Sequence, residues 1–240
     1  MTTAFRSDNF RYNTKGIFEG LSPENLEELL ETSVSHKYKK DEMVFREGGI
    51  PAGIFYLVSG KVKKYKTTAK GSEQIFYVCA AGELLGYHAV LSQEHYPDSA
   101  ATIEESEITF IPKENFLKVL QASSIFSNRL LKTLGHEFSV FINNITNLAT
   151  KSVRERIALN LLILDEKFRI TENQETPGEI NMSRTDLANM VGTAKETLVR
   201  LLQEFKKDGL IETNGRIIRV INKKAIVKEA NFSGYHSKVY

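Results

Sequence analysis

The segment that most constrains the fold lies toward the C-terminus, at residues 182–220, and reads MSRTDLANMVGTAKETLVRLLQEFKKDGLIETNGRIIRV. Two short amphipathic helical patterns meet at Gly192, and an alternating strand pattern interrupted by Asn-Gly follows them. A short helix, a tight turn, a second helix and a hairpin in this order predict a winged helix-turn-helix. Such a module presents its second helix as a narrow rod to the major groove of DNA.

The first predicted helix begins at Ser183, whose side chain is expected to cap it, with Asp186 in the first turn. Its apolar face consists of Leu187, Met190 and Val191. Gly192 then permits the left-handed backbone that a sharp turn requires. The spacing therefore predicts a short helix that packs on one face and stops abruptly.

The second predicted helix begins at Thr193, which has the capping-box spacing to Glu196. Its apolar face consists of Leu198, Leu201, Leu202 and Phe205. Its polar face carries Lys195, Glu196 and Arg200, and Gly209 follows the last turn as a stop signal. Lysine and arginine suit guanine O6 and N7, and glutamate accepts from cytosine N4. These three polar residues are therefore the predicted base readers.

Phosphate contacts are expected from side chains around the same two helices and the hairpin. They are Ser183, Thr193, Thr197 and Arg216. Arg216 lies in LIETNGRIIRV, 210–220, which predicts a hairpin with an Asn-Gly turn. Phosphate contacts set affinity and register without reading the sequence. The alternatives are a solvated charged face or a winged helix that binds protein, but the agreement of caps, turn, apolar register and hairpin favours double-stranded DNA.

Short β-like runs separated by glycines occupy residues 34 to 112. The clearest are MVFREGG, GIFYLVSGKVKKYKT, SEQIFYVCAAGELLG and SEITFIP. Short strands with regular turn signals between them predict a small sandwich or barrel. The chain is therefore predicted to be an α+β protein with an N-terminal β domain at residues 1–122.

From Lys113 to Phe168 the glycines nearly vanish and the apolar period becomes helical. Apolar residues at alternating spacings of three and four form a seam of Leu131, Leu134, Phe138, Phe141, Ile145 and Leu148. Packing on the β domain is the alternative, but a seam of about three heptads predicts a dimerisation helix at 123–150 and a homodimer. Ser152 and Glu155 then have the spacing of a capping box, which opens the DNA-binding domain predicted at 151–240.

Composition excludes several other classes of protein. The sequence has no apolar run of about 18 residues and no N-terminal signal segment. Neither membrane insertion nor secretion is therefore expected, and the cytoplasm is the predicted location. A net charge of +2 implies that any basic surface is local. Cys79 is the single cysteine, so no internal disulfide is possible, and Cys79 cannot by itself hold a thiolate-ligated zinc or iron-sulfur cluster.

The order of these segments resembles the Crp/Fnr (catabolite activator protein) family of bacterial transcription regulators, from residue 20 to 222. The sequence DLANMVGTAKETLVRLLQEFKKDGLI, 186–211, is similar to the family's DNA-binding signature. GIFYLVSGKVKKY, 53–65, resembles a strand pair of its β-roll, and NLATKSVRERIALNLL, 147–162, resembles its hinge. The resemblance implies a cyclic-nucleotide-binding-like jelly roll, a long dimerisation helix and a winged helix-turn-helix. It also implies base reading by the three residues named above, an inverted-repeat operator, and RNA polymerase contact near residues 171–178.

The resemblance locates an effector pocket as well, and there the sequence departs from the family pattern. Cyclic-AMP-responsive relatives use a glutamate in a Gly-Glu-Leu turn for the ribose and an Arg-Ser pair for the phosphate. The matching residues are Tyr87 and His88 after Gly86, then Asp98 and Ser99, with Phe141 and Ile142 at the adenine positions. A carboxylate repels a phosphate, so we expect no cyclic AMP binding of the usual kind.

We therefore expect an apolar pocket that is filled by its own side chains or that binds an unidentified ligand. A haem sensor with His88 as axial ligand and a redox sensor with Cys79 are alternatives, although such residues more often pack or hydrogen-bond. A cupin-like metal-dependent enzyme is a third alternative. It would need clustered histidines, whereas His36, His88, His95, His136 and His236 have no ligand spacing. The prediction is a regulator with neither cofactor nor metal.

Overall fold

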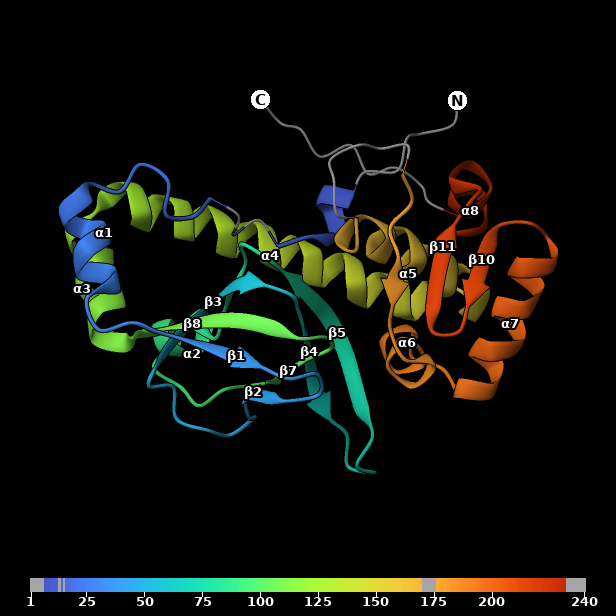
Figure 1. Ribbon diagram of the computed structural model, residues 1–240, viewed down its shortest axis with the longest axis horizontal. Helices are drawn as coiled ribbons and strands as arrows, with labels where there is room; N and C mark the ends of the chain where they lie inside the picture. Colours follow the sequence, from blue (N-terminus) through green and yellow to red (C-terminus); the bar gives the residue numbers. More distant parts are fainter. Residues whose placement is uncertain (1–6, 13, 15, 170–175, 232–240) are drawn as a thin grey trace. The chain divides into compact units, whose positions relative to one another are not determined.

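The computed structural model describes residues 7–12, 14, 16–169 and 176–231 (Figure 1). The chain divides into two compact units. The first is Tyr12–Ser139, and the second combines Met1–Arg11 with Val140–Tyr240. A short 3-10 helix, Ser7–Phe10, is the first described element of the second unit.

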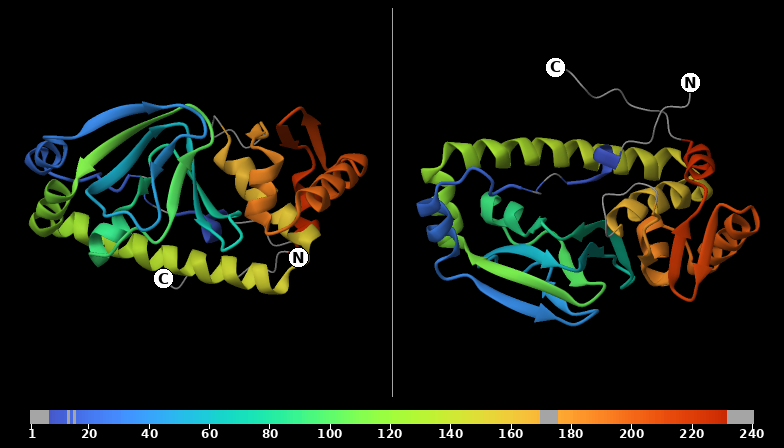
Figure 2. Two further views of the ribbon diagram at one scale, coloured as in Figure 1. Left: turned by 90° about the horizontal axis from the view of Figure 1, so that it is seen from below. Right: turned by 45° about the horizontal axis from the view of Figure 1, so that its top comes forward.

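The first unit contains two antiparallel sheets whose strands curl around a shared interior (Figure 2). One four-stranded sheet has the order β1-β8-β3-β6, and the other has the order β2-β7-β4-β5. The strands are β1 (Val34–Tyr38), β2 (Met43–Phe45), β3 (Gly53–Ser59), β4 (Lys61–Thr67), β5 (Glu73–Ala80), β6 (Leu84–Leu85), β7 (Ser99–Thr102) and β8 (Ser106–Pro112). The predicted β domain is confirmed, although β7, with the sequence SAAT, was not among the predicted runs.

Helices close one end of this β-roll. They are α1 (Pro23–Leu30), α2 (Tyr87–Ser92) and α3 (Lys113–Ala122). Leu29 of α1, Phe116 of α3 and Ile54 of β3 are fully buried in one cluster. Each such side chain contributes about 1.5–3 kcal/mol through removal of apolar surface from water. The cluster therefore fixes the helices on the sheet that carries β3.

The long helix that the sequence predicts is confirmed as α4 (Ser124–Thr150), one continuous helix of 27 residues. On one side it buries Phe126, Leu130 and Val140. Most of the predicted seam lies on the opposite side and is exposed in the single chain: Leu131 is 66% exposed, Phe138 67% and Ile145 64%. Apolar side chains of this size at heptad spacing leave a large apolar stripe facing solvent.

The second unit contains the predicted winged helix-turn-helix. Its elements are α5 (Val153–Lys167), β9 (Ile180–Asn181), α6 (Arg184–Val191), α7 (Lys195–Lys207), β10 (Ile211–Asn214), β11 (Ile217–Val220) and α8 (Lys223–Glu229). The Ser152 capping box is confirmed, because Ser152 Oγ accepts from the backbone N–H of Glu155 and the Glu155 carboxylate accepts from that of Ser152. Ser183 caps α6 as predicted. Gly192 ends α6 with the left-handed φ of +72° that the turn requires.

The predicted second capping box was wrong. The N-cap of α7 is Ala194, which makes no side-chain capping bond. The backbone N–H groups of Gly192 and Thr193 both donate to the carbonyl of Ala188 and close α6. Because Thr193 belongs to the end of the first helix, the second helix begins one residue later than the Thr193–Glu196 spacing suggested.

The hairpin is confirmed, but its turn differs from the predicted Asn-Gly turn by one residue. Asn214 pairs with Ile217, which leaves Gly215 and Arg216 as the two turn residues. A positive φ at the first of them, +55° at Gly215, is typical of a type II′ turn. In addition, β9 pairs with β11, so the predicted two-stranded ribbon is part of a three-stranded sheet with the order β10-β11-β9.

Two segments near the C-terminus lie outside the described ranges, and one of them belongs to a predicted site. Residues 170–175 include most of the loop expected to contact RNA polymerase, and residues 232–240 form the C-terminal end. The described part of the tail forms α8, which is capped by the side chain of Asn222. Within the described ranges, no helix is long and apolar enough to span a membrane.

Candidate functional site

The helix α7 has one buried face and one exposed face. Leu198 and Phe205 are fully buried, and Leu202 is 4% exposed. Lys195, Glu196 and Arg200 are exposed, as expected for side chains that turn away from this core. The apolar face therefore anchors α7 in the second unit, and the three predicted base readers are available on its surface.

The turn between α6 and α7 is held by an arginine that the sequence reasoning missed. Arg156, in the first turn of α5, donates through Nε to the carbonyl of Val191 at 2.9 Å and through Nη2 to that of Gly192 at 3.1 Å. Its Nη1 also donates to the carbonyl of Lys151 at 2.8 Å. These bonds satisfy carbonyls at the C-terminal end of α6, so Arg156 fixes the turn against the start of α5.

The predicted phosphate contacts lie around the same module. Thr193, in the turn between α6 and α7, Thr197, in the first turn of α7, and Ser183, at the N-terminus of α6, are half-buried. Ser183 Oγ is already engaged, because it accepts from the N–H of Asp186 and donates to the Asp186 carboxylate at 2.6 Å. Arg216 is exposed at the tip of the β10–β11 hairpin.

A second arginine holds that tip in place. Arg184, at the start of α6, donates to the carbonyl of Arg216 at 2.9 Å and to that of Gly215 at 3.2 Å. The hairpin is thus tied to α6 through backbone atoms of its turn. No local sequence pattern predicts these bonds, because the two carbonyls lie 31 and 32 positions from Arg184 along the chain.

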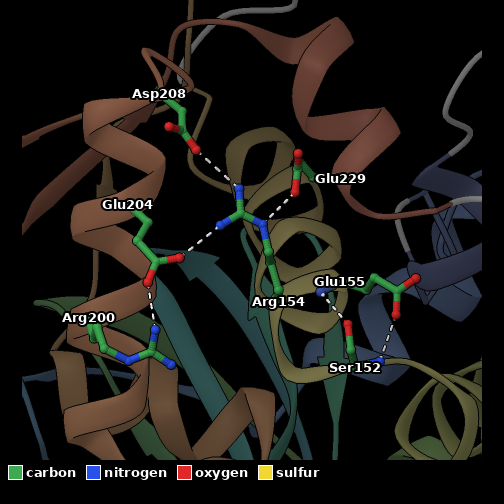
Figure 3. Close-up of polar contacts among 7 residues, drawn as sticks. All are labelled: Ser152, Arg154, Glu155, Arg200, Glu204, Asp208 and Glu229. Carbon is green, nitrogen blue, oxygen red and sulfur yellow. Dashed lines mark hydrogen bonds and ion pairs between the residues drawn. The ribbon is translucent and has the colours of Figure 1, made fainter.

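Figure 3 shows that Arg200 is not fully free on the α7 surface. Its Nη1 donates to Oε1 of Glu204, one helical turn further along, at 2.6 Å. Arg200 nevertheless remains 64% exposed. A pair this exposed is weak, so it restrains the side chain without removing it from the surface.

The residues at the predicted effector position are buried in the first unit and are not all apolar. Tyr87 is 1% exposed, Asp98 3% and Ser99 2%. Lys64, on β4, places its ammonium 3.3 Å from Oδ2 of Asp98, and Nε2 of His88 lies 3.2 Å from Oδ1 of Asp98. The expectation of an apolar pocket was therefore wrong, because β4 contributes a buried lysine at this position.

Charges and burial alter the proton affinities of these groups. Burial alone would raise the pKa of Asp98, but the Lys64 charge and the hydrogen bond to His88 lower it more, so the pKa is below its ordinary value. Burial lowers the pKa of His88, and its bond to Asp98 opposes that effect only in part. The Asp98 carboxylate is therefore ionised at neutral pH and neutralises the ammonium beside it.

Aromatic side chains pack around this ion pair. Tyr12, from the N-terminal segment, stacks on Tyr77 with 3.6 Å between ring centroids, and its backbone N–H donates to the Tyr77 hydroxyl at 2.6 Å. The Lys64 ammonium lies 5.6 Å from the centroid of the Tyr12 ring. The Tyr87 hydroxyl donates to the Glu137 carboxylate, and burial raises the pKa of both groups. The interior of the β-roll is therefore occupied by the chain's own side chains at this position.

The remaining predicted residues of the pocket lie in the second unit. Phe141 and Ile142, on the C-terminal half of α4, are 39% and 49% exposed. Ser99, the last of the predicted pocket residues, lies in the first unit, and its Oγ accepts from the backbone N–H of Glu47 at 2.9 Å.

The residues considered for haem, redox or metal chemistry form no metal site in the described part of the chain. Cys79 is fully buried. In the described part of the chain, no group of three or more His, Cys, Asp and Glu side chains is arranged to hold a metal ion.

A β-roll followed by a long helix and a winged helix-turn-helix is the domain order of a DNA-binding transcription regulator. A model of the cyclic nucleotide-binding domain matches residues 35–123, and a model of the Crp-like helix-turn-helix domain matches residues 155–228. The chain belongs to the Crp/Fnr family of DNA-binding transcription regulators, which are not enzymes.

Individual relatives agree with this assignment. The fumarate and nitrate reduction regulatory protein of Escherichia coli (strain K12) is 28% identical over 192 residues, which are 80% of this chain and 76% of that protein. The transcriptional activator protein anr of Pseudomonas aeruginosa is 29% identical over 184 residues, 77% of this chain and 75% of that protein. The structure of FixK2 from Bradyrhizobium japonicum superimposes with a TM-score of 0.72 at 22% identity, and it covers 85% of this chain and all of that one, which shows a shared fold.

Proposed function

We propose that this regulator acts in the cytoplasm as a homodimer that recognises an inverted repeat in double-stranded DNA. The observation that carries the proposal is the exposed polar face of α7, where Lys195, Glu196 and Arg200 lie opposite a buried apolar stripe. Held in a major groove, this face would read bases, and Thr193, Thr197, Ser183 and Arg216 would contact phosphates. Two such helices related by a dimer axis would occupy successive major grooves, about 34 Å apart.

The exposed stripe on α4 supports the homodimer. Leu131, Phe138 and Ile145 are each more than 60% exposed in the single chain, and Leu148 is 46% exposed. The spacing is that of a two-stranded coiled coil, in which the same stripe of a second copy is the complementary surface. We therefore assign this stripe to a second copy of the chain.

We further propose that cyclic AMP is not the effector. A cyclic phosphate at the family position would meet the Asp98 carboxylate, whose partner ammonium on Lys64 is already neutralised. The ring of Tyr12, stacked on Tyr77, occupies space beside this pair. His88 has a protein partner in Asp98, and this favours a packing role over haem ligation. Any effector would have to rearrange this cluster, or the dimer binds DNA without one.

The test of base reading is the substitution Arg200→Ala, measured as the ratio of operator to random-DNA affinity at one salt concentration. Loss of a base contact should lower the free energy of discrimination between the two DNAs by about 1–3 kcal/mol, which is about a 5- to 150-fold fall in this ratio. The matched control is Lys206→Ala, which removes one exposed cation from the other end of α7. It should leave the ratio unchanged. Equal losses on both DNAs in Arg200→Ala would move Arg200 to the phosphate-contact class.

The test of the effector proposal is calorimetric titration of the purified protein with cyclic AMP. We expect no saturable heat and no change in the melting temperature of the protein. A ligand that binds the native state would raise the melting temperature by mass action. Saturable binding that disappears in Asp98→Asn or Lys64→Met would contradict the proposal.

A further inference from the structure

Arg154 lies at a position where the start of α5 meets the end of the recognition helix α7 and the end of α8 (Figure 3). Its guanidinium pairs with three carboxylates: Nε with Glu229 at 2.6 Å, Nη1 with Glu204 at 3.0 Å and Nη2 with Asp208 at 3.2 Å. The same group lies over the ring of Phe205, 4.6 Å from its centroid. A planar guanidinium can satisfy three acceptors at fixed angles, which a lysine ammonium on a flexible stem cannot do.

Glu204 joins this cluster to the face that we propose reads bases. Its Oε2 accepts from Arg154, and its Oε1 accepts from Arg200 at 2.6 Å. One carboxylate is therefore shared between two guanidinium groups. One of these is fixed by two further carboxylates, and the other is a 64% exposed side chain.

We propose that Arg154 is a positioning residue for DNA recognition, and that it acts through Glu204 to make Arg200 available to a base. This inference rests on the proposed role of Arg200. In the free protein Arg200 is paired with Glu204, and a bidentate contact with guanine requires the guanidinium to leave that carboxylate. Arg154 determines whether the Glu204 carboxylate still has a cationic partner after Arg200 has moved to the DNA.

The electrostatic reason is the charge that remains on α7. With Arg154 in place, the departure of Arg200 leaves Glu204 still paired with a cation, so no lone carboxylate faces the phosphates of the DNA. Without Arg154, Glu204 would hold Arg200 as its cationic partner in the cluster, and releasing Arg200 would expose an unpaired anion to a polyanion. Arg154 therefore lowers the free energy needed to move Arg200 from its own helix to DNA.

The geometry fixes Arg154 in this role and leaves Arg200 as the mobile partner. Arg154 is two residues after Ser152, whose capping box fixes the first turn of α5. Its side chain is 31% exposed, half as much as that of Arg200, and its hydrogen bonds to Glu229 and Asp208 raise its pKa. Arg154 therefore stays paired with Glu204, and Arg200 is the side chain that moves when DNA offers it another acceptor.

The experiment is a double-mutant cycle on the full-length protein, with the operator-to-random affinity ratio as the readout at one salt concentration. Arg154→Met should lower the ratio by about threefold to fivefold, the size of one exposed charge contact. Glu204→Gln removes the carboxylate that both arginines share. In the Glu204→Gln background, the same Arg154→Met change should therefore have no further effect on the ratio.

Two controls separate positioning from folding. Asp208→Asn removes a carboxylate that pairs with Arg154 but not with Arg200 in the structure, and it should leave the ratio at the wild-type value. Arg154→Lys keeps the positive charge beside Glu204, so it should lower the operator-to-random affinity ratio less than Arg154→Met does. It also repeats the cycle with a milder change if the methionine variant unfolds. Melting curves of each variant confirm that folded proteins are compared.

The inference is overturned if Arg154→Met and Arg154→Lys leave the ratio unchanged while Arg200→Ala lowers it, and the proposed function then stands. It is also overturned if Arg154→Met lowers the ratio equally with Glu204 and with glutamine at that position, because Arg154 would then act through the fold of the domain. If Arg200→Ala itself leaves the ratio unchanged, the base-reading role fails first and this inference fails with it.

Discussion

Replacing Lys64 by methionine tests whether the β-roll interior depends on the buried ion pair at the predicted effector position. The side chains of Lys64 and Asp98 are 6% and 4% exposed, with 3.3 Å between the ammonium nitrogen and the carboxylate oxygen. Methionine preserves most of the side-chain volume and removes the charge. The variant would leave Asp98 buried with His88 as its remaining polar partner.

The expected loss follows from the distance and the burial. At 3.3 Å and an effective dielectric constant of about 20, two unit charges attract by about 5 kcal/mol. Removal of one partner from a buried pair costs about 3–5 kcal/mol because the other charge is left without compensation. The bond from His88 offsets part of this, so we expect a loss of about 3 kcal/mol in the free energy of unfolding of the β-roll.

Urea unfolding followed by the near-ultraviolet circular dichroism of the tyrosines measures this loss. With a denaturant slope of about 1–3 kcal/mol per molar urea, the midpoint should fall by about 1–3 M. The double variant Lys64→Met/Asp98→Asn removes both charges and should recover most of the stability. A loss below about 1 kcal/mol in Lys64→Met, or a double variant no more stable than the single one, would show that the buried ion pair does not stabilise the β-roll.

Three further outcomes are expected. The pKa of Asp98 is lower in the folded state, so the stability that Asp98 contributes is present above the unfolded pKa of about 3.9 and is lost as pH falls through the folded pKa. Asp98→Asn should therefore reduce the fall in the free energy of unfolding at acid pH. An unchanged dependence of this free energy on pH would contradict the expectation. Phe138→Glu places carboxylates on the seam and should convert dimers to monomers in sedimentation equilibrium, whereas an unchanged mass would exclude the seam as the interface. Gly192→Ala, at a φ of +72°, should destabilise the winged domain by about 1–2 kcal/mol in thermal melts, and an unchanged melting temperature would show that the turn tolerates a side chain.

Local chemistry made much of the winged domain predictable from the sequence. Ser152, Ser183 and Gly192 occupy the caps predicted for them, because each cap is decided by residues within one turn of the chain. The same reasoning failed at Thr193, whose N–H closes the preceding helix, and at the hairpin, where strand pairing moved the turn by one residue. In both places two neighbouring elements competed for the same backbone groups.

Contacts between distant segments had no such local signal. Arg156 and Arg184 lie 35 and 31 positions from carbonyls that they hold, and Arg154 lies 50 positions from Glu204. The strand β7, SAAT, contains no aromatic residue and only one β-branched residue, Thr102. It forms because β2 and β4 pair with it on either side.

The buried charge at the effector position was likewise hidden in the sequence. Simple alternation along KVKKYKT would place Lys63 and Lys64 on opposite faces, one of them in solvent. A register shift between Lys64 and Tyr65 interrupts the pairing of β4 with β5, and both lysines are buried. A predicted departure from the family pattern at Asp98 was therefore detectable from the sequence, whereas its partner was not.

Sequence-specific recognition of DNA without cyclic AMP is tested by selection of fragments from a genomic DNA pool. The purified protein selects them at fixed moderate salt, with and without cyclic AMP and with a cell extract. Salt must be held constant because non-specific affinity varies steeply with it. We expect enrichment of one inverted repeat whose half-sites are about 10 base pairs apart from centre to centre, to an extent that cyclic AMP does not change. Absence of any enriched repeat, even with the extract, would contradict sequence-specific recognition by α7. Enrichment only when cyclic AMP is added would contradict the proposal that the Lys64–Asp98 pair prevents cyclic AMP from acting as the effector.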